Sequence, residues 1–533
     1  TVKGDNFNAT FSLTDGALNS LSYGGNTVFA EGNGPKLDAF RAPTDNDAGI
    51  GYHNAWFKFG LYDLGHRVVG KPTVMKQKDG SLQISMTVES QGKEGCKQVY
   101  GNRDRDPQSA YRFGVDKQKL GKDDLKFITN QIYTIYKDGS IELNSAISAN
   151  RNSVILPRIG YAMKLPATYK QFDYYGRGPV NNYNDRKTGQ FIEHHRGIVG
   201  EQDILLPKPQ SMGNREEVRW CALTEQGKQS VVFVADSTMS VSALPWSAQQ
   251  MTVVAHANEL PASDGTYLHL DAKVTGLGGA SCGQGGPLKD DRTYSQNYNF
   301  GFVIRPAQAT AAAVAEASKV ALSGEQPISI EHKQTGKVLL STPAKNRTIV
   351  YALNGAKKPT VYTGAIDMSK GGTITTWYKE TPSQKTSMTF DKVDFVPLQI
   401  AFVSSEEPEE GDAVNLVDGD ETTIWHTMYS ITLAKYPHWV DFDASEPKTI
   451  KGFKFMPRQD TGYGRIKNYE IYVSNDGKTW GNAILKGEFD RSGELKTVMF
   501  DKPVKARYVR FRALNAHYGV DYASAAEFSL IAE

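Results

Sequence analysis

The segment LQISMTV (82–88) decides the fold class, because its apolar and polar residues alternate without a break. Alternate residues of an extended chain point to opposite sides, so this segment predicts a β-strand with one buried face. The same pattern returns at YEIYV (469–473), and the Asp-Gly turns in YKDGSI (136–141) and SNDGKTW (474–480) predict hairpins. We therefore expect an all-β protein.

Helical signals are scarce in this sequence. The one helix-like stretch, ATAAAVAEASKVAL (309–322), lacks a clear apolar face and follows Pro306, which predicts a linker or a short helix. Strands and helices do not alternate anywhere along the sequence, so a (β/α)8 barrel is not expected.

The composition argues against two classes of partner. Lys and Arg number 61 against 59 Asp and Glu, a net charge of +2, whereas a nucleic-acid footprint needs a clear basic excess. The sequence has no apolar run near the roughly 18 residues of a membrane span. We expect no nucleic acid and no membrane span. The three cysteines (Cys96, Cys221 and Cys282) form neither a metal pattern nor a disulfide framework.

Changes in composition divide the 533 residues into three blocks. The pattern of residues 1–305 predicts one large β-domain with a charged, loop-like insertion near 92–125. Residues 306–397 predict a linker and a small β-sandwich spacer, and residues 398–533 a third β-domain. The chain begins with a strand-like segment and without Met, so we expect a processed protein or a piece of a longer one.

Two patterns could be taken for chemistry. Asn258-Glu259 has the Asn-Glu order of some glycosidase acids, but it lies between strand-like runs with no barrel around it, so we do not expect a catalytic glutamate there. His194-His195 predicts a solvated turn rather than a metal site.

Six segments in residues 40–283 carry a resemblance to the small domain of family-two β-galactosidases. They are FRAPTDNDAGIG (40–51), NAWFKFGLYDL (54–64), DYYGRGPVNNYNDRK (173–187), PKPQSMGNREEVRW (207–220), SALPWS (242–247) and GTYLHLDAKVTGLGGASCG (265–283). The resemblance implies a galactose mutarotase-like β-supersandwich packed against a catalytic barrel of the same polypeptide. That barrel carries both carboxylic acids of the retaining mechanism and would lie outside this chain.

The same resemblance implies roles for single residues. Arg177, Asp185 and Arg186 are expected to face the barrel or to pair internally. Family members commonly have Glu where this chain has Asn181 or Asn182, so one salt-bridge partner is missing. Ser281 and Cys282 stand where the family can carry a tryptophan that reaches the sugar, so they are expected at the active-site rim or in a packed loop.

The third block resembles a second family, the discoidin-type (coagulation factor 5/8 type C) jelly roll, and within it carbohydrate-binding module family thirty-two. The matching segments are NLVDGDETTIWHT (415–427), YPHWVDFD (436–443), FMPRQDTGYGRIKNYEIYVSNDGKTW (455–480) and ARYVRFRALNAHYGVDYASAAEF (506–528). The middle block resembles, more weakly, fibronectin-like or chitobiase C-terminal sandwiches.

The module resemblance implies two sites. A structural calcium ion would be held by Asp418, Asp420, Thr423 and Glu527, the alternative being a plain Asp-Gly turn. A galactose-type sugar would be bound by an aromatic face and polar groups, here Glu409 or Glu410, His426, Tyr429, Arg458 and Tyr518. Tyr463 stands where the family often has Asn, which would shift specificity or replace a polar contact by stacking.

These observations predict the C-terminal, non-catalytic part of a secreted or periplasmic retaining β-galactosidase that hydrolyses terminal β-galactosides. The small domain would buttress the barrel, and the module would bind galactose-containing glycans. This chain alone would be inactive. An adhesive carbohydrate-binding protein is the first alternative, and an aldose epimerase, suggested by the mutarotase-like fold, is the second.

Overall fold

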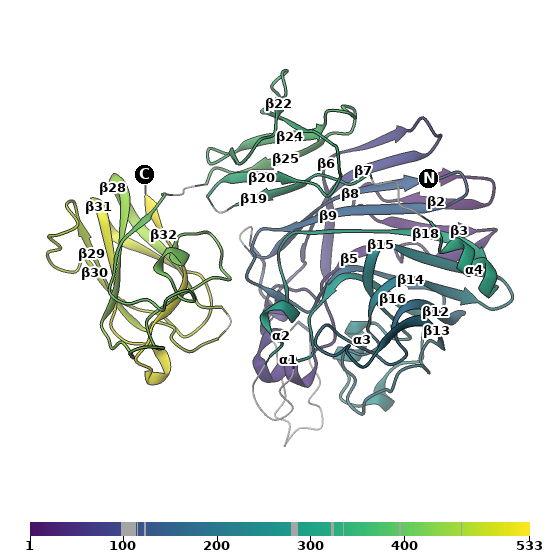
Figure 1. The fold of residues 1–533 in the computed structure, drawn as a ribbon, viewed down its shortest axis with the longest axis horizontal. Helices are drawn as coiled ribbons and strands as arrows, with labels where there is room; N and C mark the ends of the chain where they lie inside the picture. The colour runs from purple at the N-terminus through teal and green to yellow at the C-terminus, as the bar shows by residue number, and fades with distance from the viewer. Residues whose placement is uncertain are drawn as a thin grey trace.

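The computed structural model describes residues 1–96, 113–114, 116–121, 124–278, 286–320, 325–333, 335–393, 396–459 and 461–532. It shows three β bodies: an N-terminal domain (residues 1–308), a middle domain (325–390) and a C-terminal module (396–532) (Figure 1). The predicted all-β class is confirmed. Within the described ranges, no helix is long and apolar enough to span a membrane.

Two sheets form most of the N-terminal domain. The smaller has four strands in the order β1-β2-β3-β4: β1 (Val2–Lys3), β2 (Phe7–Phe11), β3 (Leu18–Tyr23) and β4 (Asn26–Phe29). The larger has twelve: β5 (Lys36–Asp38), β6 (Leu64–Lys76), β7 (Leu82–Gly92), β8 (Lys126–Ile135), β9 (Ile141–Ala149), β11 (Arg158–Leu165), β12 (Tyr169–Gly178), β13 (Phe191–Ile198), β14 (Arg215–Glu225), β15 (Gln229–Leu244), β16 (Thr266–Val274) and β18 (Tyr298–Gln308). Two short strands, β10 (Ile155–Leu156) and β17 (Thr293–Tyr294), pair separately.

The larger sheet runs β13-β12-β14-β15-β18-β9-β8-β7-β6, with β16 joining β15 to β11 and β11 pairing with β5. One apolar core joins the two sheets, with Phe7 and Leu21 from the smaller sheet and Tyr133, Phe233 and Phe302 from the larger. The predicted supersandwich is confirmed.

The strand LQISMTV is β7, and it differs from the prediction in one respect. Ile84, Met86 and Val88 are buried as the alternation predicts, but Gln83 and Thr87 are buried as well. The reason is that the middle domain covers the polar face of β7, β8 and β9.

Side chains on that face donate hydrogen bonds to carbonyl groups of the middle domain. Asn130 donates to Ile328 (2.9 Å), and Asn144 donates to Glu325 (3.1 Å). The middle domain is therefore docked on the sheet through hydrogen-bonded polar groups rather than held at a distance from it.

The middle domain is a small sandwich, as predicted. Its strands are β19 (Ser329–His332), β20 (Lys337–Ser341), β21 (Ile349–Leu353), β22 (Thr360–Val361), β23 (Ile366–Asp367), β24 (Gly372–Tyr378) and β25 (Thr386–Phe390). A three-stranded and a four-stranded sheet share one core that includes Ile330, Val338 and Ile374.

The helices of the described residues are short, and sequence analysis missed three of these four. They are α1 (Asp45–Ile50), α2 (Tyr52–Lys58), α3 (Ala248–Thr252) and α4 (Ala311–Ala317); short 3-10 turns are η1 (Ala257–Glu259), η2 (Lys289–Asp291), η3 (Ala413–Leu416) and η4 (His517–Gly519). The signal for α1 is a capping box: Thr44 accepts from the Asp47 amide, and Asp47 accepts from the Thr44 amide. Helices of five to seven residues are too short to show periodicity.

The C-terminal module has strands β26 (Gln399–Val403), β27 (Trp425–His426), β28 (His438–Pro457), β29 (Asn468–Ser474), β30 (Leu485–Glu488), β31 (Lys496–Ala513) and β32 (Ser524–Ala532). Their order is β27-β32-β28-β31-β29-β30, with β26 on β28. The core contains Trp425, Phe442, Phe453 and Phe511. The predicted discoidin-type sandwich is confirmed.

Candidate functional site

His426, at the end of β27, is the centre of a polar and aromatic cluster in the module. Only 6% of it is exposed, and its ring stacks on Tyr522 (centroids 5.0 Å apart) and meets Tyr429 edge to face at 4.9 Å. Burial lowers the pKa of His426, so the ring is neutral at pH 7. Its Nδ1 lies 2.6 Å from the Thr427 carbonyl, which can only accept, so Nδ1 carries the proton and Nε2 is a hydrogen-bond acceptor.

Acidic residues of the 407–411 turn surround Tyr429. The Tyr429 hydroxyl donates to Glu410 (2.6 Å), whereas Glu409 has left-handed backbone (φ 66°) and an exposed side chain. Of the two alternatives, the structure therefore brings Glu410 into the cluster.

Glu407 is a residue that sequence analysis missed. It accepts hydrogen bonds from the backbone amides of Tyr429 (2.7 Å) and Ser430 (3.1 Å). The Ser430 hydroxyl and these amides lower the pKa of Glu407, so it stays ionised and fixes the loop that bears Tyr429. Its only sequence signal is its place in an acidic run, which does not separate it from its neighbours.

Arg458 follows the end of β28. Its carbonyl accepts a hydrogen bond from Arg465 Nε (3.0 Å), which closes the loop between them. The hydrogen bond to Glu410 raises the pKa of Tyr429, and the positive charge of Arg458 lowers it by a smaller amount. The cluster thus combines a cation, an anion and a neutral imidazole.

Tyr463 and Tyr518 form an exposed aromatic pair beside the cluster. Their centroids lie 5.4 Å apart with the planes tilted by 44°, and 55% and 62% of the two residues are exposed. Tyr518 has left-handed backbone (φ 65°), a strained conformation that recurs at binding sites. Gly464 connects the pair to the cluster, because a Cβ there would lie 3.1 Å from the Tyr522 ring.

These contacts bring residues of four distant loops to one end of the module. Apolar ring faces and hydroxyl-binding groups side by side are what a pyranose ring requires, because one face of the sugar is C–H and its rim is hydroxyl. Tyr522, which carries the stacking of His426, was missed because nothing distinguishes it in sequence from other tyrosines of that loop.

The side chains of three of the four predicted calcium ligands, Asp418, Thr423 and Glu527, lie together, and the fourth, Asp420, contributes only its carbonyl. Thr423 Oγ1 donates to Asp418 (2.9 Å), and Asp420 joins through its carbonyl, which accepts from the Thr423 amide (3.1 Å). Burial and the adjacent Asp418 raise the pKa of Glu527 to about 9, and Glu527 Oε1 is buried with no hydrogen-bond partner.

The Asp420 carboxylate, however, turns away from this group. It accepts from Asn152 (2.9 Å) and from Thr422 (2.9 Å to the amide). In the described part of the chain, no three His, Cys, Asp or Glu side chains are grouped to hold a metal. Two carboxylates with an orphaned oxygen, next to loop carbonyls, nevertheless fit a hard cation.

In the N-terminal domain, Arg177, Asp185 and Arg186 pair internally. Arg177 Nε lies 3.0 Å from Glu217, which supplies a salt-bridge partner although this chain has Asn at both 181 and 182. Arg186 donates to Asn181 (2.6 Å). Asp185 accepts from the amides of 277 and 278 (3.1 and 2.7 Å).

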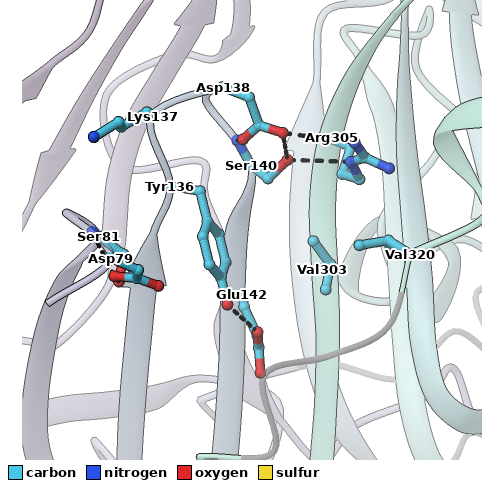
Figure 2. Close-up of a pocket in the computed structure, with 10 residues that line it drawn as sticks. All are labelled: Asp79, Ser81, Tyr136, Lys137, Asp138, Ser140, Glu142, Val303, Arg305 and Val320. Atoms are coloured by element: carbon cyan, nitrogen blue, oxygen red, sulfur yellow. Dashed lines mark hydrogen bonds and ion pairs between the residues drawn. The ribbon is translucent and has the colours of Figure 1, made fainter. Parts of the chain in front are cut away.

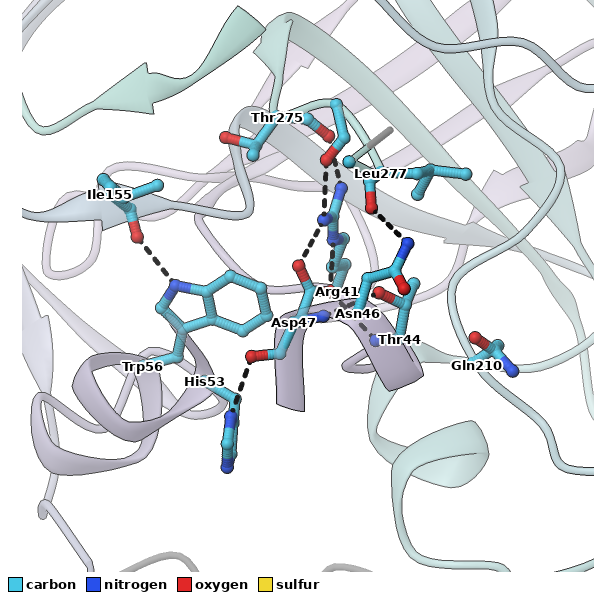
Figure 3. A network of polar contacts seen from close by, with 12 residues as sticks. Arg41, Thr44, Asn46, Asp47, His53, Trp56, Ile155, Gln210, Thr275 and Leu277 are labelled. Atoms are coloured by element: carbon cyan, nitrogen blue, oxygen red, sulfur yellow. Dashed lines mark hydrogen bonds and ion pairs between the residues drawn. The ribbon is translucent and has the colours of Figure 1, made fainter. Parts of the chain in front are cut away.

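The 275–278 segment is held from a second side by the first family motif (Figure 3). Arg41, 1% exposed, pairs with Asp47 (2.7 Å) and donates to the carbonyls of Thr275 and Gly276. Asn46 donates to the Leu277 carbonyl (2.7 Å). The motifs therefore meet around one segment, which leads towards Ser281 and Cys282; these two lie outside the described residues.

Two other expectations are settled here. His194-His195 lies in strand β13 rather than in a turn, where His194 is 3.3 Å from Asp173. Glu259 is exposed and accepts from the amides of Ala255 and His256 in its own turn, which is a capping role.

An epimerase would need a histidine base next to an acid in an open pocket. His269 Nδ1 lies 3.7 Å from Asp38, and Arg158 Nε lies 3.5 Å from Asp271; His269, Arg158 and Asp271 are buried, and Asp38 is partly buried. Burial raises the pKa of Asp38 to about 6 and that of Asp271 to about 7.

A cavity of about 390 Å³ opens in the N-terminal domain, between the turns before β7 and β9 (Figure 2). Its polar groups bond to one another: Tyr136 donates to Glu142 (2.9 Å) and Arg305 donates to Ser140 (3.1 Å). Its lining includes none of the predicted sugar-binding residues.

The fold and the two motif clusters define a β-supersandwich joined to a discoidin-type module. Residues 3–304 match the family model described as "Beta galactosidase small chain", and residues 399–528 match "F5/8 type C domain". Because the first match covers more than half of the chain, the chain belongs to the β-galactosidase small-chain family.

Two curated relatives show the two parts. The β-galactosidase of Priestia megaterium is 28% identical over 310 residues, 57% of this chain and 26% of that protein. The sialidase of Micromonospora viridifaciens is 36% identical over 148 residues, 27% of this chain and 23% of that protein. The chain thus spans about a quarter of the length of these relatives.

Solved structures similar to the module include two from Clostridium perfringens. One is CpGH89CBM32-5 in complex with GalNAc-β-1,3-galactose: 34% identity, 26% of this chain, 99% of that chain, TM-score 0.24. The other is the family 32 module of NanJ in complex with galactose: 25% identity, 26% of this chain, 97% of that chain, TM-score 0.24.

Proposed function

We propose that the module binds the terminal galactose-type residue of a glycan, and that the N-terminal domain buttresses the catalytic barrel of a retaining β-galactosidase. The observation that carries the first part is the cluster around His426 beside the exposed pair Tyr463 and Tyr518.

The cluster offers each kind of contact that a galactose ring needs. His426 Nε2 accepts from one hydroxyl, Glu410 accepts from another, and the Arg458 guanidinium donates to ring or hydroxyl oxygens. The exposed face of Tyr518 receives the C–H side of the ring. Tethering of this kind raises the local concentration of substrate without new chemistry.

Calorimetry tests the sugar site with galactose, N-acetylgalactosamine and lactose. We expect Arg458→Ala to weaken galactose binding by about tenfold or more, since hydrogen bonds to charged groups contribute about 1.5–3 kcal/mol. The control is Arg507→Ala, which removes a partly exposed pair with Asp443 elsewhere on the module. Unchanged binding in Arg458→Ala would refute the site.

The buttress role is supported by the small-chain match together with the short span of the chain on its relatives. The motif cluster around 275–278 consists of residues that bond to one another, as in a rigid support. The enzyme part carries the two acids of the retaining mechanism. We expect no hydrolysis of nitrophenyl β-galactoside by this chain and clear hydrolysis by a protein that includes the barrel. Activity of this chain alone would contradict the division of roles.

We further propose a calcium ion held by Asp418, Glu527 and loop carbonyls such as that of Asp420. When bound, the cation would neutralise the paired carboxylates and stabilise the loop. A ligand that binds only the folded state stabilises it by about 2.7 kcal/mol at a hundredfold excess over Kd. We expect calcium to raise the melting temperature of the module, and Asp418→Asn to abolish that rise.

A further inference from the structure

The loop that carries the proposed calcium ligands also contacts the N-terminal domain. On the module side the contact is made by Asp420 and Glu421, and on the other side by Asn152. Asn152 Nδ2 donates to the Asp420 carboxylate (2.9 Å), and its Oδ1 accepts from the Glu421 amide (3.3 Å). The side chain of Asn152 thus forms hydrogen bonds with both a side chain and a backbone amide of the loop.

Glu421 is the most enclosed part of this contact, with 3% of the residue exposed. It accepts hydrogen bonds from the Ser153 hydroxyl and from Arg151 Nη2 (3.4 Å). Arg151 in turn lies over the Phe59 ring, 5.4 Å from its centroid. A carboxylate buried this deeply is stable only while its partners remain in place, so these contacts require the two domains to be docked.

The opposite side of the same six residues, 418–423, carries the proposed calcium ligands. Asp420 shows the division most clearly, because its carboxylate bonds to the N-terminal domain while its carbonyl bonds to Thr423. Asp420 therefore links the docking contact directly to the loop that carries the proposed cation ligands.

Four carboxyl groups (Asp418, Asp420, Glu421 and Glu527) gather in this region, and Arg151 lies 3.4 Å from Glu421. Negative charges this close together repel one another, which opposes closure of the loop. A divalent cation would relieve that repulsion, and a docked domain would hold the loop in the conformation that the cation requires.

We propose that residues 418–423 form the docking surface of the module for the N-terminal domain, and that docking and calcium binding at this loop strengthen each other. The inference rests on the calcium site proposed above. Calcium then sets how firmly the sugar-binding module is oriented on the enzyme part, and by thermodynamic reciprocity the N-terminal domain raises the affinity of the module for calcium.

Two measurements on the whole chain test this coupling, with calcium chloride as the probe. Titration calorimetry gives the calcium affinity of the wild type, of Asn152→Ala and of Asn8→Ala, a matched control that changes an exposed asparagine of the same domain. Since couplings between sites usually reach at least about fivefold, we expect Asn152→Ala to weaken calcium binding by about that factor and Asn8→Ala to leave it unchanged.

Hydrogen exchange supplies the second readout, in a segment that holds no proposed ligand. We expect amides 150–154 of the N-terminal domain to exchange several-fold faster after calcium is removed by a chelator in the wild type. In Asp418→Asn, which lacks a ligand but keeps the docking residues, calcium should no longer change that exchange.

The outcomes separate the two proposals. Calcium binding with slower exchange at 150–154 supports the coupling. Calcium binding with the same affinity in Asn152→Ala, and without any change at 150–154, overturns the coupling and leaves the calcium site standing. No calcium binding in the wild type overturns both.

Discussion

The motif cluster of the N-terminal domain and the cluster at the end of the module use the same residue types but differ in how their polar groups are satisfied. In the first, Arg41, Asp47 and Asp185 bond to one another or to backbone, and Arg41 is almost fully buried. In the second, Tyr463 and Tyr518 present more than half of their surface to solvent, and Nε2 of His426, on the ring edge away from Thr427, is a hydrogen-bond acceptor. Arginines, acids and tyrosines therefore indicate a binding site only where the fold leaves them exposed.

The largest effect should come from breaking the buried cluster. Arg41→Ala removes the partner of Asp47 and leaves a buried carboxylate unpaired, which typically costs about 3–5 kcal/mol. We expect the N-terminal domain to unfold at a clearly lower denaturant concentration. Hydrogen exchange of the amides in segment 40–51 measures this transition. Arg67→Ala, which breaks an exposed pair with Glu89, should cost less than about 1 kcal/mol. Equal effects of the two variants would show that the cluster is not structural.

In the module, by contrast, a substitution in the cluster should weaken sugar binding and leave the stability of the fold unchanged. Tyr518→Ala leaves the core intact, so its stability should hardly change, but it removes a ring face from the sugar site. Truncation of a central aromatic side chain often costs 1–2 kcal/mol or more in binding, which is about tenfold in Kd. Calorimetry with lactose checks this.

Two substitutions of Tyr463 test whether its aromatic ring takes part in sugar recognition. Tyr463→Phe keeps the ring and should bind lactose as the wild type does, whereas Tyr463→Asn, the residue common in the family, removes the second face. If Tyr463→Asn matched the wild type for every sugar, the tilted pair would have no role in recognition.

A pH-dependent effect concerns the buried group around Asp271. Its pKa is about 7 in the folded state, raised by burial, against 3.8 for an ordinary aspartate. A raised folded-state pKa stabilises the protein fully below the unfolded value, and that contribution is lost as pH rises through about 4 to 7. His269 and Asp38 titrate nearby, so the difference between the wild type and Asp271→Asn is the quantity to measure. We expect the wild type to lose stability relative to Asp271→Asn between pH 4 and 8; a constant difference would contradict the assignment.

Much of the fold could be predicted because its signals are local. Alternation in 82–88 and the Asp-Gly turns gave strands and hairpins, and the ordered motifs gave the two domain classes. The burial of Gln83 and Thr87 could not be predicted, because the group that covers them, the middle domain, lies about 250 residues away. The capping box at Thr44 and Asp47 was visible in the sequence and would have indicated α1.

The candidate site divides in the same way. The resemblance to the module family predicts His426, Tyr429, Arg458, Tyr463 and Tyr518, and the structure places them at one end of the module. Glu407 accepts a hydrogen bond from a backbone amide of another loop, and Tyr522 stacks on a ring of another loop. No local sequence pattern predicts such contacts. The turn of Asp420 towards Asn152 depends on a second domain and was equally invisible.

A crystal structure of this chain soaked with galactose tests the central claim most directly. The account predicts a galactose ring stacked on Tyr518, with a hydroxyl donating to His426 Nε2 and the Arg458 guanidinium within hydrogen-bond distance of the sugar. A ring bound elsewhere on the chain, or an empty site at concentrations where galactose-binding modules are saturated, would contradict it.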